Sequence, residues 1–191
     1  MKKTLSSLAI AALFSAAATT TVSAQAAMTP GTVMVGGMAM YPNKDIVANA
    51  VNSKDHTTLV AAVKAAGLVE TLQGKGPFTV FAPVNDAFEN LPAGTVETLL
   101  KPENKATLTK VLTYHVVAGN MNAKAIMAAI KAGKGKATLK TVSGGTLTAT
   151  MNGANNVVLT DESGNTASIS TYDVTQSNGV IHVIDKVMLP K

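Results

Sequence analysis

Apolar residues recur at helical spacing between residues 45 and 67, and this spacing predicts two successive helices. Asp45 can cap the first, because its carboxylate can accept hydrogen bonds from the free backbone N–H groups of the first turn. Asp55 or Thr57 can cap the second, and Gly67 can end it in the left-handed conformation that often follows a helix. The apolar stripe of the second helix is formed by Leu59, Val60, Val63 and Ala66.

A β-strand is predicted at residues 78–82, where aromatic and β-branched residues follow the turn at Gly76 and Pro77. Short helical segments come next, the first capped by Asn85 or Asp86. A second strand is predicted over residues 114–117, and Asn122 caps a last helix.

From Gly133 onward, helical periodicity gives way to alternation of apolar and polar residues. This alternation is typical of strands that bury one face. Turn signals separate the strands, namely Gly144-Gly145, Asn152-Gly153, residues 161–165 and Asn178-Gly179. Helices first and a β-meander afterwards predict one α+β domain, with the helices packed against a sheet of antiparallel strands.

Residues 1–26 have the layout of a secretory signal peptide. Lysines at positions 2 and 3 precede an apolar run over residues 5–18, and a small-residue stretch ends at Ala26. We expect cleavage after Ala26, or alternatively after Ala24, which would make the protein secreted or periplasmic. The apolar run is shorter than the roughly 20 residues of a spanning helix, so no membrane span is expected after cleavage.

Residues 27–40 are rich in glycine and methionine and show no sustained period, which predicts a flexible leader before a domain at residues 41–191. Met34, Met38 and Met40 cluster in this leader. Thioethers can bind Cu(I), but methionine also serves as adaptable apolar filler, and we favour the second interpretation.

Composition removes several classes of function. The chain has no cysteine, so disulfides and thiol chemistry are absent and the core alone must hold the fold. Its formal charge is +5, and loss of the two signal lysines lowers it to +3. Every basic residue is lysine and none is arginine. The chain therefore lacks the planar guanidinium group, which forms paired hydrogen bonds with guanine bases and with phosphate. We therefore expect no nucleic-acid partner.

Three ordered segments resemble the signatures of the fasciclin domain family. Residues 76–88 resemble its first signature, Tyr114-His115-Val116-Val117 its central Tyr-His motif, and residues 178–190 its second signature. The similarity runs from about Tyr41 to Lys191 and is closest to small secreted bacterial members with a single domain. It implies a β-wedge flanked by helices and a role in surface or matrix interaction.

The resemblance also makes Tyr114 and His115 a candidate interaction motif, because the equivalent motif of some animal fasciclin domains is linked to integrin binding. We favour a core role for the pair. We likewise expect His182 to be a structural, hydrogen-bonded histidine, because strand alternation places it on the face opposite Asp185.

No enzyme motif is found, and no catalytic residue, cofactor or metal ion is predicted. No serine lies in a Gly-x-Ser-x-Gly elbow, and no phosphate-binding loop is present. Asp161, Ser163 and Asn165 mimic the start of a calcium loop, but the required glycine and glutamate are missing, so we interpret them as a turn.

Two hypotheses of function follow. The favoured one is a monomeric, non-enzymatic, secreted module that binds a cell-surface or matrix protein or a polysaccharide through exposed edges and loops. The alternative is a carrier of a small apolar ligand, or a weak hydrolase, with a cleft between helices and sheet. An apolar cleft would favour the alternative, and a filled core would favour the module.

Overall fold

The computed structural model describes residues 30–191. The expected signal peptide, residues 1–26, and the start of the expected leader lie outside this part of the chain. Within residues 30–191, no helix is long and apolar enough to cross a membrane.

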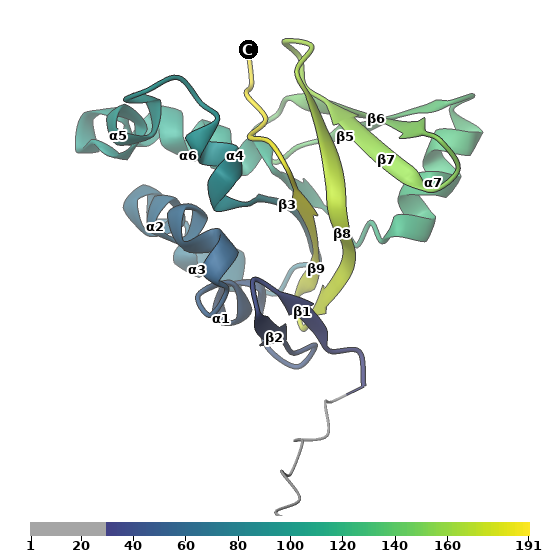
Figure 1. Ribbon diagram of the computed structural model, residues 1–191, viewed down its shortest axis with the longest axis horizontal. Coiled ribbons are helices and arrows are strands. Elements are labelled where there is room, and N and C mark those ends of the chain that lie inside the picture. The colour runs from purple at the N-terminus through teal and green to yellow at the C-terminus, as the bar shows by residue number, and fades with distance from the viewer. Residues whose placement is uncertain (1–29) are drawn as a thin grey trace, which may run out of the picture.

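Helices occupy mainly the first two thirds of the described chain. They are α1 (Ile46–Ala50), η1 (Lys54–His56), α2 (Thr57–Ala66), α3 (Val69–Gln73), α4 (Asn85–Glu89), α5 (Thr95–Leu100), η2 (Pro102–Asn104), α6 (Lys105–Tyr114) and α7 (Ala123–Ala132). All except α7 gather on one side of the sheet, while α7 packs at its far end (Figure 1). The strands are β1 (Val33–Val35), β2 (Met38–Met40), β3 (Phe78–Pro83), β4 (Val116–Ala118), β5 (Lys136–Lys140), β6 (Thr146–Asn152), β7 (Asn156–Thr160), β8 (Thr166–Gln176) and β9 (Gly179–Ile184).

The main sheet has seven strands in the order β4-β3-β9-β8-β7-β6-β5. Strands β3 and β9, second and third in this order, pair in parallel, although about a hundred residues separate them in sequence. The other pairs are antiparallel. Both β3 and β9 are buried on both faces, which explains their nearly continuous apolar sequence. The predicted α+β class is confirmed, with one parallel pair that the expected antiparallel arrangement lacks.

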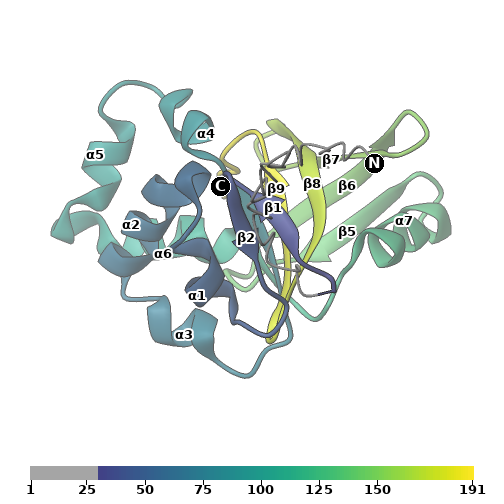
Figure 2. The ribbon, with the colours of Figure 1, turned by 60° about the horizontal axis from the view of Figure 1, so that its bottom comes forward.

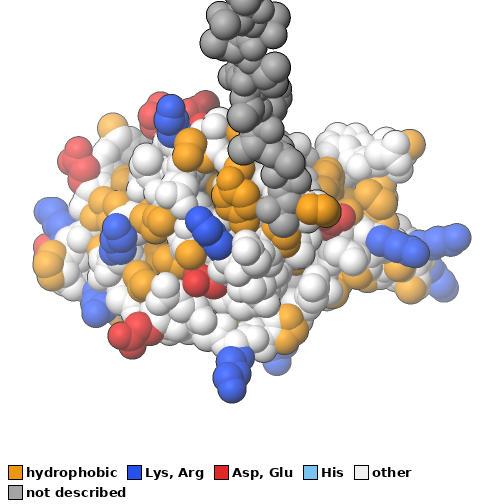
Figure 3. Space-filling view, turned by 90° about the horizontal axis from the view of Figure 1, so that it is seen from below, with side chains coloured by type: hydrophobic (Ala, Val, Ile, Leu, Met, Phe, Trp, Pro, Cys, Tyr) orange, Lys and Arg blue, Asp and Glu red, His pale blue; other side chains and the backbone are white. Residues whose placement is uncertain are grey.

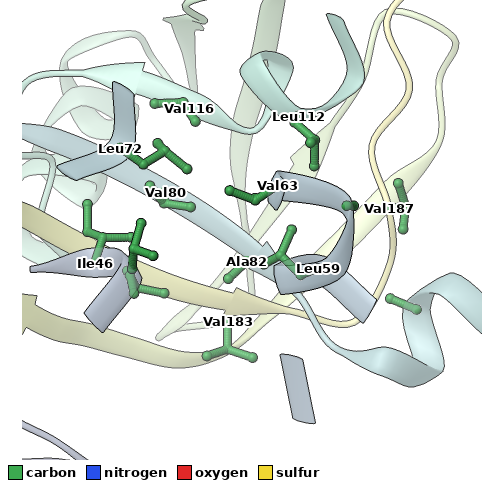
Figure 4. Packing of buried hydrophobic residues seen from close by; sticks show 14 of the residues in the cluster. Ile46, Leu59, Val63, Leu72, Val80, Ala82, Leu112, Val116, Val183 and Val187 are labelled. Atoms are coloured by element: carbon green, nitrogen blue, oxygen red, sulfur yellow. The ribbon is translucent and has the colours of Figure 1, made fainter. Parts of the chain in front are cut away.

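The sheet separates two hydrophobic cores. One lies between the sheet and helices α1 to α6, and Figure 4 shows Val63, Val80 and Val183 within it. The other lies inside the curled meander of β5 to β9, where α7 contributes Ile126 and Ile130. Strand alternation divides β3 between the two, because a strand directs successive side chains to opposite faces.

Residues 33–40 form a two-stranded antiparallel hairpin, β1 and β2, where the sequence predicts an irregular leader. The hairpin lies beside α1 and β8 (Figure 2). Val35 and Met40 are buried in the helical core, 7% and 2% exposed. Each strand has only three residues, too few for a visible alternation, so tertiary packing and not a local pattern creates this hairpin.

Predicted helix ends are confirmed in part. Asp45 accepts a hydrogen bond from Ala48 N at 2.8 Å, and Asn122 does the same for Ala125 N at 2.8 Å. Gly67 ends α2 in the left-handed region with φ of 73°.

The predicted caps of α2 and α4 are wrong, and α4 begins at Asn85 after Val84 with no side-chain cap. Neither Asp55 nor Thr57 caps α2. Asn85, the first residue of α4, accepts a hydrogen bond from Thr58 N at 3.1 Å and donates one to the Lys54 carbonyl at 2.8 Å. A side chain from the first signature segment thus satisfies the start of a helix 27 residues earlier, a contact that only the folded chain provides.

The strand predicted at residues 114–117 begins two residues later in the structure than the sequence indicated. Tyr114 is the last residue of α6, and β4 starts at Val116. Tyr114 and His115 follow Val111 at helical spacings of three and four, so the apolar stripe of α6 continues through the pair.

Candidate functional site

Tyr114 and His115 are buried, with 0% and 3% of their surfaces exposed. The Tyr114 hydroxyl donates to the Thr146 carbonyl at 2.6 Å and accepts from Glu162 N at 3.2 Å. Burial raises the pKa of this phenol. In this conformation neither side chain offers surface to a partner, and their contacts are those of core residues.

His115 links α6 to the C-terminal segment. Its Nδ1 lies 2.8 Å from the Val111 carbonyl, and its Nε2 accepts from Met188 N at 3.0 Å. Since a carbonyl can only accept, Nδ1 carries the proton and the ring is neutral. Burial lowers the pKa of His115 to about 4, and the opposing effects of the Val111 carbonyl and Asp161 are smaller.

His182 is a structural histidine, as predicted. Its Nε2 donates to the Met121 carbonyl at 2.8 Å, and its Nδ1 accepts from Asp173 N at 3.3 Å. The ring stacks on Phe81 with centroids 5.6 Å apart, and burial lowers its pKa. Asp185 is exposed and accepts instead from Ser168 N at 2.7 Å, so no histidine–carboxylate pair forms here.

The Asp161 loop is a turn, as predicted, and both oxygens of the Asp161 carboxylate accept hydrogen bonds from other residues of the chain. Oδ1 accepts from Ser163 N and Asn165 N, and Oδ2 accepts from Asn165 Nδ2 and Leu189 N. Burial alone would raise the pKa of Asp161, but these hydrogen bonds outweigh burial and lower it. The carboxylate therefore anchors the C-terminal segment to the turn.

The hairpin places Met34 of the expected leader on the face opposite Met38 and Met40. Met40 is buried, and register places Met34 opposite Ala39 but Met38 opposite Val35. Met34 and Met38 thus project to opposite faces, which is unsuited to a shared copper ion. Among residues 30–191, no group of three histidine, aspartate or glutamate side chains could hold a metal ion.

A polar face covers the outside of the meander formed by β5, β6, β7 and β8. We call it the outer hydroxyl face, and it comprises Lys136, Thr138, Lys140, Thr146, Thr148, Thr150, Val158, Thr160, Thr166 and Ser168. All of these residues are exposed or half-buried, whereas their sequence neighbours on the strands point into the second core. In the sequence, threonine or lysine at every second position of these strands is the signal of this face, but it does not show which residues lie side by side.

Strand register aligns four threonines of this face in one row across four strands. Thr138 lies opposite Thr148, which lies opposite Thr160, which lies opposite Thr166. Neighbouring strands lie about 4.8 Å apart, so the hydroxyls form a regularly spaced line. None of the four hydroxyls bonds to another residue of the described chain, which leaves each free as donor and acceptor.

Lysines border the threonine row and make the face basic. Lys136 and Lys140 lie on the edge strand β5, either side of Thr138, and pair with no acid among residues 30–191. One carboxylate lies at the border of the outer hydroxyl face, because Glu162 accepts hydrogen bonds from the backbone N–H and the hydroxyl of Thr146. Lysine side chains gather at the end of the molecule where α7 and β5 lie (Figure 3).

An apolar cavity of about 80 Å³ lies on the other side of the sheet, between the strands and helices α1 to α3. Its walls include Val63, Leu72 and Val80, together with Val35 and Met40 of the hairpin. The helical core is therefore not completely filled, but this cavity is much smaller than the roughly 300–1,000 Å³ of a typical ligand pocket, so it gives the ligand-carrier hypothesis only weak support.

Comparison with known proteins places the chain in one family. The sequence profile of the Fasciclin domain matches residues 54–190. Protein sll1483 of Synechocystis sp. is 50% identical over 145 residues, which cover 76% of this chain and 73% of that protein. Immunogenic protein MPB70 of Mycobacterium bovis is 35% identical over 170 residues, covering 86% of this chain and 77% of that protein.

Animal proteins match as well, over a smaller share of their length. Transforming growth factor-beta-induced protein ig-h3 of Sus scrofa is 39% identical over 134 residues, 70% of this chain but 17% of that protein. A solved FAS1 domain pair from the insect cell adhesion molecule Fasciclin I shares the fold, with a TM-score of 0.67 and 17% identity. That match covers 78% of this chain and 51% of the solved chain. The chain belongs to the fasciclin domain family.

Proposed function

We propose that this protein is a secreted, non-enzymatic interaction module whose outer hydroxyl face binds an anionic polysaccharide of a cell surface or matrix. The row of Thr138, Thr148, Thr160 and Thr166, bordered by unpaired Lys136 and Lys140, carries this proposal. The described relative Fasciclin I is a cell adhesion molecule, which supports a role of this general kind.

The chemistry of the face suits a charged sugar polymer. Free hydroxyls can both donate to and accept from sugar hydroxyls, and lysines attract carboxylate or sulfate groups. A row of equivalent groups offers a repeating polymer several weak contacts at once, and linked contacts strengthen one another through their high effective concentration.

A protein partner fits this face less well. Stable protein interfaces are enriched in aromatic residues, methionine and arginine, and their binding energy concentrates in a few such anchors. The outer hydroxyl face has none of these residues, and Val158 is its single apolar member.

A hydrolase gains no support from the residues around the cavity. Ser53 Oγ lies 2.9 Å from His56 Nδ1, which brings a hydroxyl and a base together. However, Ser53 is 2% exposed and is not part of the cavity wall, so this hydroxyl does not face a place where substrate could lie.

The test is binding of residues 27–191 to polygalacturonate, with neutral dextran as the control polymer. We expect saturable calorimetric binding to polygalacturonate alone, weakening as salt increases because exposed charges are screened. The double variant Lys136→Gln/Lys140→Gln should bind at least tenfold more weakly. Its matched control is Lys75→Gln/Lys101→Gln, which removes the same charge from exposed positions outside the face.

A second pair of substitutions tests the hydroxyls apart from the charge. Thr148→Val/Thr160→Val removes two hydroxyls from the row and keeps the β-branched shape. We expect weaker binding with an unchanged salt dependence. Equal losses in the Lys136/Lys140 and Lys75/Lys101 variants, or no polymer binding by the unaltered protein, would contradict the proposal.

A further inference from the structure

Two asparagines of the chain are followed by glycine, at Asn152-Gly153 and at Asn178-Gly179. This dipeptide is chemically reactive, because the backbone nitrogen of the glycine can attack the side-chain carbonyl carbon of the asparagine, and glycine has no Cβ to obstruct the approach. The reaction needs an unrestrained side chain and a backbone that can bend toward it. Since the two dipeptides are alike in sequence, their surroundings decide which of them reacts.

The side chain of Asn178 is fixed by three hydrogen bonds. It is 8% exposed, and its Oδ1 accepts from Ile46 N at 3.0 Å. Its Nδ2 donates to the Leu72 carbonyl at 2.8 Å and to the Gly74 carbonyl at 3.0 Å. The amide therefore connects α1 and the end of α3 to the start of β9, and it cannot turn toward its own backbone while these bonds persist.

The backbone after Asn178 is fixed as well. Gly179 is the first residue of β9 and pairs with Phe78 of β3 on one side and with Gln176 of β8 on the other. The space around it is full, because even a Cβ at this position would collide with the Phe78 carbonyl. The glycine nitrogen at this site is therefore held away from the asparagine side chain.

Asn152 has none of these restraints. It is the exposed last residue of β6, and its side chain makes no hydrogen bond within residues 30–191. The Gly153 N–H also has no partner in the described chain, and a Cβ on Gly153 would meet no atom within 4 Å. Residues 153–155 form an exposed turn between β6 and β7, on the side of the molecule away from α2 and α5 (Figure 1). Such turns open locally at little cost in free energy, so the nitrogen can approach the side chain.

We propose that Asn152 is a site of spontaneous deamidation in the folded protein, and that the fold protects Asn178 from the same reaction. The Gly153 nitrogen forms a bond to Cγ of Asn152, its proton passes through solvent to Nδ2, and Nδ2 leaves as ammonia. Water then adds to either carbonyl of the resulting succinimide ring and breaks that C–N bond, which gives aspartate or isoaspartate. One water is consumed and one ammonia is released, and no oxidant or cofactor is needed.

The reaction adds a negative charge at one end of the outer hydroxyl face. Asn152 follows Thr148 and Thr150 at steps of two along β6, so the new carboxylate projects on the same side as their hydroxyls. Register pairs Asn152 with Asn156, and isoaspartate lengthens the backbone by one methylene group at this last pair of the hairpin. Deamidation does not depend on polysaccharide binding, so either proposal can fail alone.

Incubation of residues 27–191 at pH 8 in water enriched in oxygen-18 tests the proposal, because each hydrolysed ring takes up one heavy oxygen. Cleavage after Tyr172 by chymotrypsin separates Asn152 from Asn178 for mass spectrometry. We expect labelling at Asn152 to be roughly a hundredfold faster, because three hydrogen bonds of ordinary strength must break before Asn178 can react. In urea, where both dipeptides are unfolded, the two asparagines should be labelled at similar rates.

One variant and one neighbouring residue provide the controls. Gly153→Ala places a Cβ beside the attacking nitrogen and should slow labelling at Asn152 roughly tenfold. Asn155 is exposed in the same turn but is followed by asparagine, so it should be labelled much more slowly than Asn152. The proposal is overturned if Asn152 is labelled in urea but not in the folded protein, if folded Asn178 or Asn155 is labelled as fast as Asn152, or if Gly153→Ala leaves the rate unchanged.

Discussion

Stability of the protein should fall on acidification because His115 is buried as a neutral ring. The pKa of His115 is about 4 in the folded protein, whereas an ordinary histidine has a pKa of 6.5. Between these pH values the unfolded chain binds a proton that the folded chain does not. Stability from His115 is therefore complete above pH 6.5, declines as the pH falls, and is lost by pH 4.

The size of the effect follows from the shift. One pKa unit corresponds to about 1.4 kcal/mol, so the change from 6.5 to about 4 predicts a loss of about 3 kcal/mol in unfolding free energy. The structural reason is specific: protonation of Nε2 would place an N–H against Met188 N, whose hydrogen bond it now accepts. His56 and His182 have lowered pKa values too and act in the same direction.

Urea unfolding at pH 7 and pH 4, for the wild type and for His115→Gln, measures this contribution. The variant should be less stable at pH 7 but should lose about 3 kcal/mol less than the wild type between the two pH values. His56 and His182 remain in both proteins, so the difference isolates His115. If both proteins show the same pH dependence, burial of neutral His115 is not the cause of acid sensitivity.

Tyr114→Phe keeps the ring but removes the two hydrogen bonds of the hydroxyl, and should lower the unfolding free energy by roughly 1–3 kcal/mol in urea titrations; unchanged stability would contradict the core role. Asn85→Ala removes the cap of α2 and should cost about 1–2 kcal/mol, whereas Asn90→Ala, at the exposed end of α4, should be within about 0.5 kcal/mol of wild type. Gly36→Ala would place a Cβ 2.6 Å from Ser53 Oγ, so it should lower the melting temperature more than Gly37→Ala, where no atom lies within 4 Å; equal effects would refute the tight contact of hairpin and domain.

Local patterns predicted the helices and strands of the domain well where caps, turns and periodicity agree. Asp45, Asn122 and Gly67 act as expected because each satisfies or ends a helix through groups a few residues away. The prediction for the cap of α2 was wrong because the capping side chain, Asn85, comes from another helix. The hairpin at residues 33–40 was not predicted, because its burial against the domain has no local signature in the sequence.

At the candidate sites too, local patterns predicted some features, whereas others depend on contacts between distant segments. Alternation predicted that His182 and Asp185 diverge, and the structure agrees. The motif pair Tyr114 and His115 could be named from sequence, but its helical position and burial could not.

The sequence by itself determined which residues of the meander face outward, because side chains alternate along any strand. It also determined the two signature strands, whose apolar composition requires burial on both faces. Only the tertiary structure decided that β3 and β9 pair in parallel, and that Thr138, Thr148, Thr160 and Thr166 fall into one row. Pairing and register depend on the packing of distant segments, so no local pattern could specify them.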